Sequence, residues 1–224
     1  MRKVVVNLES RTDRRSEMEK QLARIGWQAE FFKAIRPIDP KGFPSIGARG
    51  CFLSHLSILQ QAARDRVEGL LIMEDDLNFA ANFSELWPAA YEKLRTRSWS
   101  IFYPAHDFRS FGDGLVELPS RTSVLCTHFM VFNGDALPII VGELEAILSR
   151  PPGDPLGGPM HVDGAYSTIR LTNPDMKTFG YTPALGYQRS SRTDIGENKL
   201  FDRIELLRPV VHGIRKLRER MRKL

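Results

Sequence analysis

The chain has 224 residues, of which 42% are hydrophobic and 26% charged, and its net charge is +5. This length suits one large α/β domain, and the hydrophobic content excludes a wholly disordered chain. No uncharged apolar run reaches the roughly 20 residues that a membrane-spanning helix needs. Two cysteines exclude a disulfide scaffold and a four-cysteine zinc site, so we expect a reduced, cytoplasmic protein.

Strands and helices alternate along the chain. The run Leu70–Met73 is apolar without alternation, which is typical of a strand buried on both faces, whereas Met18, Leu22 and Ile25 recur at helical spacing before Gly26. Ser10 or Thr12 is expected to cap that helix. In chain order we expect a strand at 3–8, a helix ending at 26, a strand at 28–34, a loop at 35–48, a helix at 49–66, strands at 70–73 and 99–104 flanking a helix at 83–96, a loop at 105–120, a strand at 122–132, helices at 135–149 and 162–171, a strand at 177–183 and a polar loop at 184–198. This alternation predicts a single α/β domain with a mostly parallel central sheet.

The positive charge is concentrated at the C-terminal end. Residues 203–224 contain eight Lys and Arg against two acids, and apolar residues recur there every three or four positions, which predicts a basic amphipathic helix. Such a helix suits an anionic membrane surface, on the inner face of the cytoplasmic membrane, or it packs on its own domain or a partner chain. Without interleaved aromatic residues it does not indicate nucleic-acid binding. We therefore divide the chain into a domain at 1–199 and a C-terminal helix at 200–224.

Three consecutive carboxylates, Glu74, Asp75 and Asp76, follow the buried strand at 70–73. Ligands of open α/β sheets bind beyond the carboxyl ends of the strands, so this position is the first place to look for a site. Ionised carboxylates repel one another, and a hard divalent ion such as Mg²⁺ or Mn²⁺ would neutralise them. A solvated acidic turn or a helix N-terminus is the alternative.

Several short motifs together resemble glycosyltransferase family 25, which includes enzymes of lipopolysaccharide assembly and collagen galactosyltransferases. They begin with Asn7-Leu8 and a nearby pair of arginines, continue with a Gly-Cys-x-x-Ser-His segment and the Glu-Asp-Asp strand end, and close with looser matches. The matching residues are Asn7, Leu8, Arg14, Arg15, Gly50, Cys51, Ser54, His55, Glu74, Asp75, Asp76, Val162, Asp163, Pro183, Gln188, Thr193, Asp194 and Ile195. The resemblance covers about residues 3–196.

This resemblance implies a GT-A-like (Rossmann-like) fold, a nucleotide-sugar donor and a divalent metal, Mn²⁺ or Mg²⁺. Asp76 is then the expected metal ligand, with Asp75 and Glu74 as further ligands, supporting groups or ribose contacts. Because the family inverts the anomeric centre, a general base is also expected, and Asp163 is the candidate; metal ligation and helix capping are its other roles. Inverting transfer of galactose from UDP-galactose to a hydroxyl of a bacterial surface glycan or glycolipid is the implied reaction.

Further residues are expected to bind the donor. Arginine suits phosphate, so Arg14 or Arg15 is a candidate for the diphosphate, and Asn7 ends the neighbouring strand. Ser54 and His55 are expected near the strand end, although a purely structural histidine is equally consistent with the sequence. The family match also includes Gln188 and Asp194, in a polar loop that could close over the donor.

Two other functions fit parts of the sequence. A metal-dependent phosphohydrolase also uses carboxylates at strand ends, but it needs further acidic or histidine ligands, and none is evident at clear spacing. A non-catalytic nucleotide-sugar-binding protein would have lost its catalytic groups, whereas the acidic triplet and Asp163 are both present.

Overall fold

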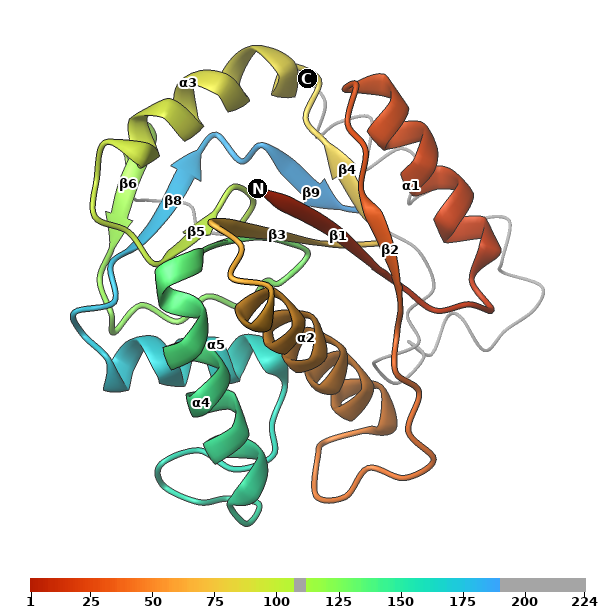
Figure 1. Cartoon of the computed structure of the whole chain (residues 1–224), viewed down its shortest axis with the longest axis vertical. Helices are drawn as coiled ribbons and strands as arrows, with labels where there is room; N and C mark the ends of the chain where they lie inside the picture. Colours follow the sequence, from red (N-terminus) through yellow and green to blue (C-terminus); the bar gives the residue numbers. More distant parts are fainter. Residues whose placement is uncertain (107–111, 190–224) are drawn as a thin grey trace.

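The protein folds around one seven-stranded sheet in the order β2-β1-β3-β7-β5-β8-β6, and a two-stranded β4-β9 ribbon adjoins it (Figure 1). The structure is a computed structural model and describes residues 1–106 and 112–189. The strands are β1 (Arg2–Asn7), β2 (Glu30–Lys33), β3 (Gly69–Glu74), β4 (Leu77–Phe79), β5 (Ile101–Tyr103), β6 (Gly114–Leu118), β7 (Phe129–Asn133), β8 (Thr178–Thr182) and β9 (Gly186–Gln188). The helices are α1 (Thr12–Arg24), α2 (Ile46–Arg64), α3 (Phe83–Arg95), α4 (Leu137–Ser149) and α5 (Val162–Thr172), with a 3₁₀ turn at Gly134–Ala136.

Five of the seven strands run in one direction. Strands β1, β2 and β3 are parallel, β5 and β8 are parallel to each other, and β7 and β6 are the strands that run antiparallel to their neighbours. The predicted α/β fold with a mostly parallel central sheet is therefore confirmed. Because β1, β3, β5 and β8 share a direction, their carboxyl ends lie along one edge of the sheet.

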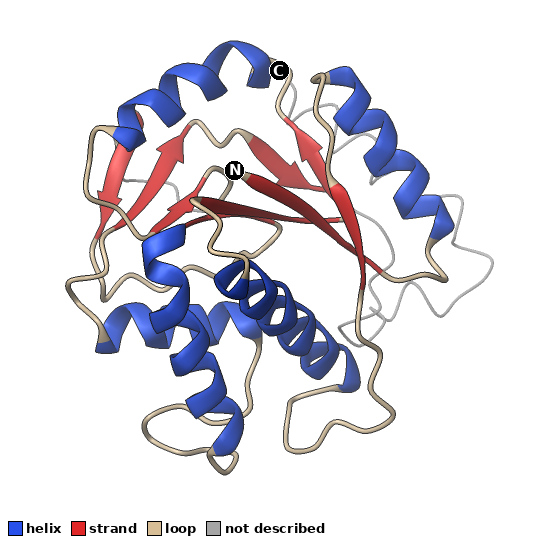
Figure 2. Cartoon of the chain, in the orientation of Figure 1, coloured by secondary structure: helices blue, strands red, loops and turns tan. Residues whose placement is uncertain are grey.

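Helices cover both faces of the sheet (Figure 2). Helices α2, α4 and α5 lie on one face, where they bury Val4 and Ile72; α1 and α3 lie on the other, where they bury Val5 and Met73. Successive residues of a strand point to opposite faces, so a strand with both faces covered must be apolar at every position. This burial explains the unbroken apolar runs of β1 and β3.

Some element predictions need correction. Residues 114–118 form β6 and residues 186–188 form β9, where loops were expected; each is a short strand held by pairing to a distant partner. The strand expected at 122–132 begins only at Phe129. Helix α2 begins at Ile46, inside the expected loop, because Ser45 Oγ accepts the Ala48 N–H at 3.0 Å and caps the helix. Helix α1 has Arg11 at its N-cap position, without the expected side-chain cap.

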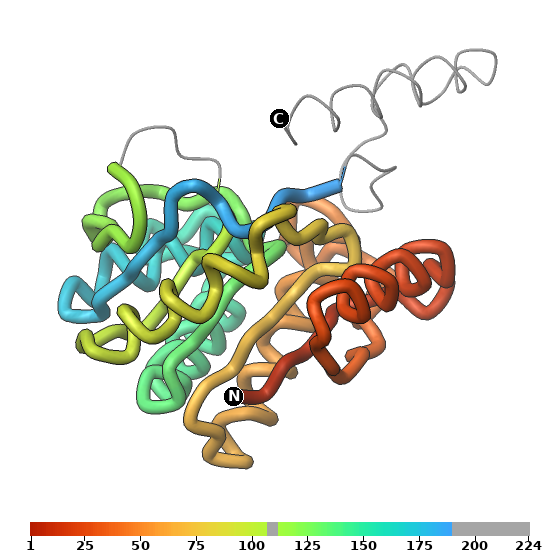
Figure 3. Tube along the Cα trace, turned by 90° about the horizontal axis from the view of Figure 1, so that it is seen from above, coloured from red at the N-terminus to blue at the C-terminus, as the bar shows by residue number. Residues whose placement is uncertain are grey.

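The C-terminal part of the described chain returns to the acidic triplet. Strand β9 pairs antiparallel with β4, with Leu77 opposite Gln188. Figure 3, which views the molecule from the side of α1 and α3, shows the blue segment ending at 189 beside the gold segment that follows β3. The predicted basic helix at 200–224 and Asp194 lie outside the described residues. Within the described residues, no helix is long and apolar enough to cross a bilayer.

Candidate active site

The acidic triplet forms a turn at the carboxyl edge of the sheet. Glu74 is the last residue of β3, and Asp75 and Asp76 connect it to β4. Asp75 is 6% exposed and Asp76 is 5% exposed, so neither is a solvated surface residue. The alternative of a solvated acidic turn is thereby excluded, and the buried charges require compensation.

Three side chains from other elements contact the two aspartates. Asn7 Nδ2, at the end of β1, donates to Asp75 Oδ2 at 2.7 Å. Arg14, on α1, places its Nη1 2.9 Å from Asp75 Oδ1 and 3.2 Å from Asp76 Oδ2, while Gln188 Nε2 donates to Asp76 Oδ2 at 3.3 Å. The structure thus brings together three residues that the sequence placed at the donor site, from β1, α1 and β9.

This compensation is incomplete. Burial, reinforced by the neighbouring Asp76, raises the pKa of Glu74 to about 8, although a hydrogen bond from Thr127 Oγ1 at 2.6 Å opposes the shift. Burial also raises the pKa of Asp76, against the attraction of Arg14. Asp76 Oδ1 is buried and, within the described part of the chain, accepts no hydrogen bond. A carboxylate oxygen with no donor, among carboxylates whose ionised forms are disfavoured, fits a hard divalent cation.

Asp163 lies in the first turn of α5, on the covered face that α2 also occupies. Its Oδ1 accepts the Gly164 N–H at 2.7 Å, and its side chain is partly exposed. After burial, the charges of Glu74, Asp163 and Asp76 are the causes that raise the pKa of Cys51, on α2. The charge of Asp163 therefore acts on the same thiol as the charges of Glu74 and Asp76, and a Glu74 carboxylate oxygen lies within 4.8 Å of the Cys51 sulfur.

His55 and Ser54 lie one turn further along α2 and are fully buried. His55 Nδ1 is 3.1 Å from Tyr166 Oη, and burial lowers the pKa of the imidazole to about 4, so it is neutral near pH 7. Ser54 Oγ donates to the Gly50 carbonyl and accepts the Ile35 N–H at 2.8 Å. The hydrogen bond from Ile35 holds the loop after β2 against α2, whereas the one to Gly50 lies within the helix.

Gly50 has a packing role in the same contact. A Cβ atom at Gly50 would lie 2.5 Å from the Ile35 carbonyl oxygen, so only glycine allows this close approach. Gly50 and Ser54 therefore have a structural role: they hold the loop after β2 against α2, the helix that carries Cys51 and His55.

The side chain of Arg15 makes different contacts from that of Arg14. Its Nε is 3.0 Å from Glu19 Oε1, and its guanidinium lies 4.3 Å from the centre of the Phe31 ring. Glu19 is on α1 and Phe31 is on β2, so neither of these contacts joins Arg15 to the aspartates. Of the two predicted arginines, the structure brings Arg14 to the carboxylates.

Sequence reasoning missed two residues that contact the triplet. Arg189 donates from Nη2 to the Asp75 carbonyl at 3.0 Å and from its backbone N–H to the Asp76 carbonyl at 2.7 Å. Thr127, which hydrogen-bonds Glu74, lies in a stretch that was predicted to be a strand. The adjacency of Arg189 to Gln188 is the signal that could have indicated the first of them.

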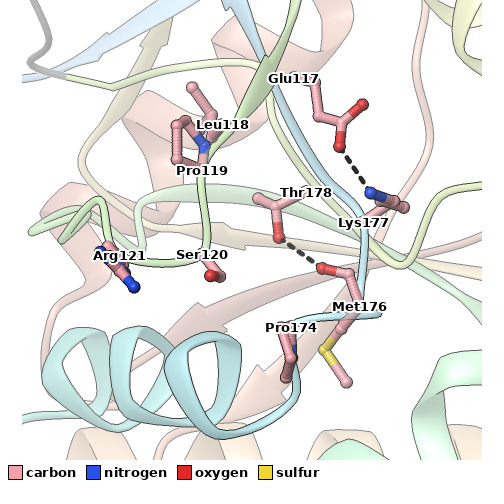
Figure 4. A pocket seen from close by; sticks show the side chains of 9 residues that line it. All are labelled: Glu117, Leu118, Pro119, Ser120, Arg121, Pro174, Met176, Lys177 and Thr178. Atoms are coloured by element: carbon pink, nitrogen blue, oxygen red, sulfur yellow. Dashed lines mark hydrogen bonds and ion pairs between the residues drawn. The ribbon is translucent and has the colours of Figure 1, made fainter.

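A separate hollow of about 300 Å³ lies where β6 ends and β8 begins (Figure 4). Lys177 Nζ is 3.0 Å from Glu117 Oε1 across this hollow, so each neutralises the other. The amino end of β8 faces the opposite edge of the sheet from Asp75 and Asp76. This hollow is therefore not part of the acidic site.

Comparisons with known proteins match the segment of the chain that contains the acidic turn. The model of "Glycosyltransferase family 25 (LPS biosynthesis protein)" matches residues 43–109, a segment that contains all of α2 and the acidic turn. A protein of Acanthamoeba polyphaga mimivirus, named as glycosyltransferase R655, is 40% identical over 98 residues, which are 37% of this chain and 30% of that protein. A "Glycosyltransferase 25 family member" of Anopheles gambiae is 27% identical over 121 residues, 44% of this chain and 20% of that protein.

Solved structures match the chain at low identity, with TM-scores below 0.5. A glycosyltransferase involved in the glycosylation of the major capsid of PBCV-1 is 14% identical, with a TM-score of 0.49 over 81% of this chain and 80% of that chain. A Drosophila β1,4-galactosyltransferase 7 in complex with manganese, UDP-Gal and xylobiose is 12% identical, with a TM-score of 0.41 over 93% of this chain and 80% of that chain.

Over these matched segments the chain is similar to glycosyltransferases. Among glycosyltransferases, the family model and this insect relative both point to a resemblance with family 25 over the matched segments. The matched segment covers less than a third of the length of the curated relatives.

Proposed function

We propose that this chain is a metal-dependent, inverting glycosyltransferase that takes its sugar from a nucleoside diphosphate donor. The observation that carries the proposal is the buried carboxylate turn at the end of β3, in which Oδ1 of Asp76 has no hydrogen-bond partner among the described residues. The charge of Asp163, at the start of α5, acts with those of Glu74 and Asp76 to raise the pKa of Cys51. The family match over residues 43–109 includes this turn. The α/β sheet supports the proposal because its ligand edge is where this turn lies.

The two aspartates are the proposed metal ligands, with Mn²⁺ or Mg²⁺ as the ion. When bound, the dication neutralises the negative charge that develops on the departing diphosphate. Asp76 offers Oδ1, and Asp75 is held in place by Asn7 at 2.7 Å and by Arg14 at 2.9 Å. Arg14 already lies between both carboxylates, so its guanidinium is next to the position proposed for the diphosphate, which it suits by geometry and charge.

Asp163 is the proposed general base. As the acceptor hydroxyl oxygen bonds to the anomeric carbon, the bond from that carbon to the diphosphate breaks, and the hydroxyl proton passes to the Asp163 carboxylate. In the described part of the chain, Oδ1 of Asp163 accepts the Gly164 N–H, and no hydrogen bond reaches Oδ2. One oxygen therefore fixes the carboxylate while the other is available for the proton.

The finer identity of the substrates rests on the family resemblance. UDP-galactose is the proposed donor, and a hydroxyl of a bacterial surface glycan or glycolipid is the proposed acceptor. Residues 203–224, which lie outside the described residues, are proposed to bring the protein to an anionic membrane surface from the cytoplasm through their basic charge.

A thermal-shift panel of UDP-, GDP- and CDP-sugars, each with and without Mn²⁺, tests the proposal. A ligand that binds only the native state at 100 times its Kd adds about 2.7 kcal/mol of stability. We expect a UDP-sugar with Mn²⁺ to raise the Tm by about 5–10 °C, and either component alone to raise it much less. If none of the donors shifts the Tm with Mn²⁺, the proposed function is wrong. Release of phosphate without sugar transfer would favour the phosphohydrolase instead.

A further inference from the structure

A second group of metal-binding side chains lies beside the aspartates. Cys51 and His55 are four residues apart on α2, so they occupy the same helix face, and Glu74 approaches them from the end of β3. One ligand atom from each of the three, the Cys51 sulfur, a His55 ring nitrogen and a Glu74 carboxylate oxygen, lie within 4.8 Å of one another. Ligand atoms around one Zn²⁺, at about 2.0–2.3 Å from the ion, lie within about 4 Å of one another. A small side-chain adjustment therefore closes this group around an ion.

The environment of the His55 imidazole indicates that this group binds a metal ion. The side chain is fully buried, and Nε2 has no hydrogen-bond partner in the described part of the chain. The other nitrogen, Nδ1, is 3.1 Å from Tyr166 Oη. When Nδ1 carries the proton and donates it to Tyr166, Nε2 presents its lone pair, which is the arrangement that supports metal-bound histidines. A buried polar atom without a partner is costly, and a metal ion would satisfy it.

The chemistry of these ligands differs from that of the aspartate site. A thiolate and an imidazole favour Zn²⁺ and similar transition ions, whereas carboxylates alone favour Mg²⁺ or Mn²⁺. We propose that Cys51, His55 and Glu74 form a Zn²⁺ site that is separate from the position at Asp75 and Asp76. On binding, the sulfur–metal bond replaces the S–H bond of Cys51, and the thiol proton is released to solvent.

Two further observations fit this site. Cys51 and Glu74 are partly exposed, whereas His55 is buried, so the group is accessible to an ion through its two outer members. Thr127 donates to Glu74 Oε1, so Oε2 can bind the metal without loss of that hydrogen bond. Three protein ligands leave a fourth tetrahedral position for water or a substrate atom. The site does not depend on the transferase activity proposed above.

The test measures binding of the metal alone to the full chain. Purified, metal-free protein is titrated with Zn²⁺ by calorimetry and with Co²⁺ by absorption, because a cobalt–thiolate bond gives a charge-transfer band that oxygen ligands do not. We expect one equivalent of Zn²⁺, a thiolate band with Co²⁺, and loss of the band in Cys51→Ser with a drop in Zn²⁺ affinity of more than about 10-fold. Circular dichroism confirms that the variant is folded.

Two control variants make the result specific. Cys126→Ser removes the other cysteine, and Asp76→Asn removes the proposed ligand of the hard ion; both are expected to keep the thiolate band and the Zn²⁺ affinity. The proposal is overturned if the wild-type protein shows no thiolate band with Co²⁺, a result that needs no variant to fold. It is also overturned if Cys51→Ser binds Zn²⁺ as tightly as the wild type, or if Asp76→Asn abolishes Zn²⁺ binding.

Discussion

Asp76→Asn is expected to abolish Mn²⁺-dependent binding of UDP while the fold stays intact. The substitution replaces the unpartnered Oδ1, or its neighbouring oxygen, by an amide that cannot carry the negative charge a dication needs. In calorimetric titrations with Mn²⁺ present, the heat of UDP binding should disappear. We expect that Asp75 cannot replace the lost Asp76 carboxylate, because Asn7 and Arg14 already contact the two oxygens of Asp75.

The stability of the same variant distinguishes loss of binding from loss of fold. Burial raises the pKa of Asp76, which means that ionisation costs more in the folded than in the unfolded state. The resulting destabilisation grows as the pH rises above the unfolded-state pKa, and a neutral asparagine removes it. We therefore expect the Tm at pH 7 in the absence of metal to be equal to or higher than that of the wild type. Asp175→Asn, at an exposed position, is the matched control and should keep UDP binding. Unchanged UDP binding in Asp76→Asn would refute the ligand assignment.

Asp163→Asn is expected to lower turnover by roughly 10²–10⁴-fold, the usual contribution of a general base. The amide keeps the oxygen that accepts the Gly164 N–H, so the start of α5 should be preserved, but it cannot accept the acceptor's proton at neutral pH. Affinity for UDP with Mn²⁺ should stay at the wild-type value, since this carboxylate is not proposed to hold the ion. Steady-state transfer assays together with calorimetry measure both quantities.

The control for this variant is Asp135→Asn. Asp135 also lies in the first turn of a helical segment, so the two substitutions remove the same favourable interaction with a helix N-terminus. Turnover of Asp135→Asn should equal that of the wild type. If Asp163→Asn loses Mn²⁺ binding, Asp163 is a metal ligand instead; if its turnover falls less than about 10-fold, it is neither base nor ligand.

Local patterns predicted the long elements of the fold well. The apolar run of β3 and the helical periodicity of α2 are each visible within one continuous stretch of sequence, so the sequence alone locates these two elements. Strands β4, β6 and β9 were missed because each has three to five residues and is defined by hydrogen bonds to a partner elsewhere in the chain. Pairing of this kind is not visible in a local pattern.

In the candidate site too, some residues were evident from a local sequence pattern and others only from contacts between distant parts of the chain. The acidic triplet was evident because three adjacent carboxylates after an apolar run are unusual. Asp75 and Asp76 are buried, and their role in a site stays a prediction. The choice between Arg14 and Arg15 was open in the sequence, since adjacent helix residues point about 100° apart. Only the packing of α1 against the end of β3 directs Arg14 to the carboxylates.

Ser54 and His55 illustrate a limit of motif-based prediction. The motif indicated residues close to the donor, yet the hydrogen bonds of Ser54 go to Gly50 and Ile35, and His55 contacts Tyr166. Their contribution to donor binding stays a prediction. The partner of His55 is 111 residues away in the chain, so the spacing of the motif contained no information about it.

The most direct test of the account is the position of a bound metal. Crystals of the full chain grown with Mn²⁺ and UDP should show, in an anomalous difference map, one Mn²⁺ ion in contact with Asp76 Oδ1 and with the diphosphate oxygens. The ion should lie at the carboxyl edge of β3, on the side where Asp163 begins α5. Bound UDP with its diphosphate away from Asp75 and Asp76, and no ion at either carboxylate, would contradict the account.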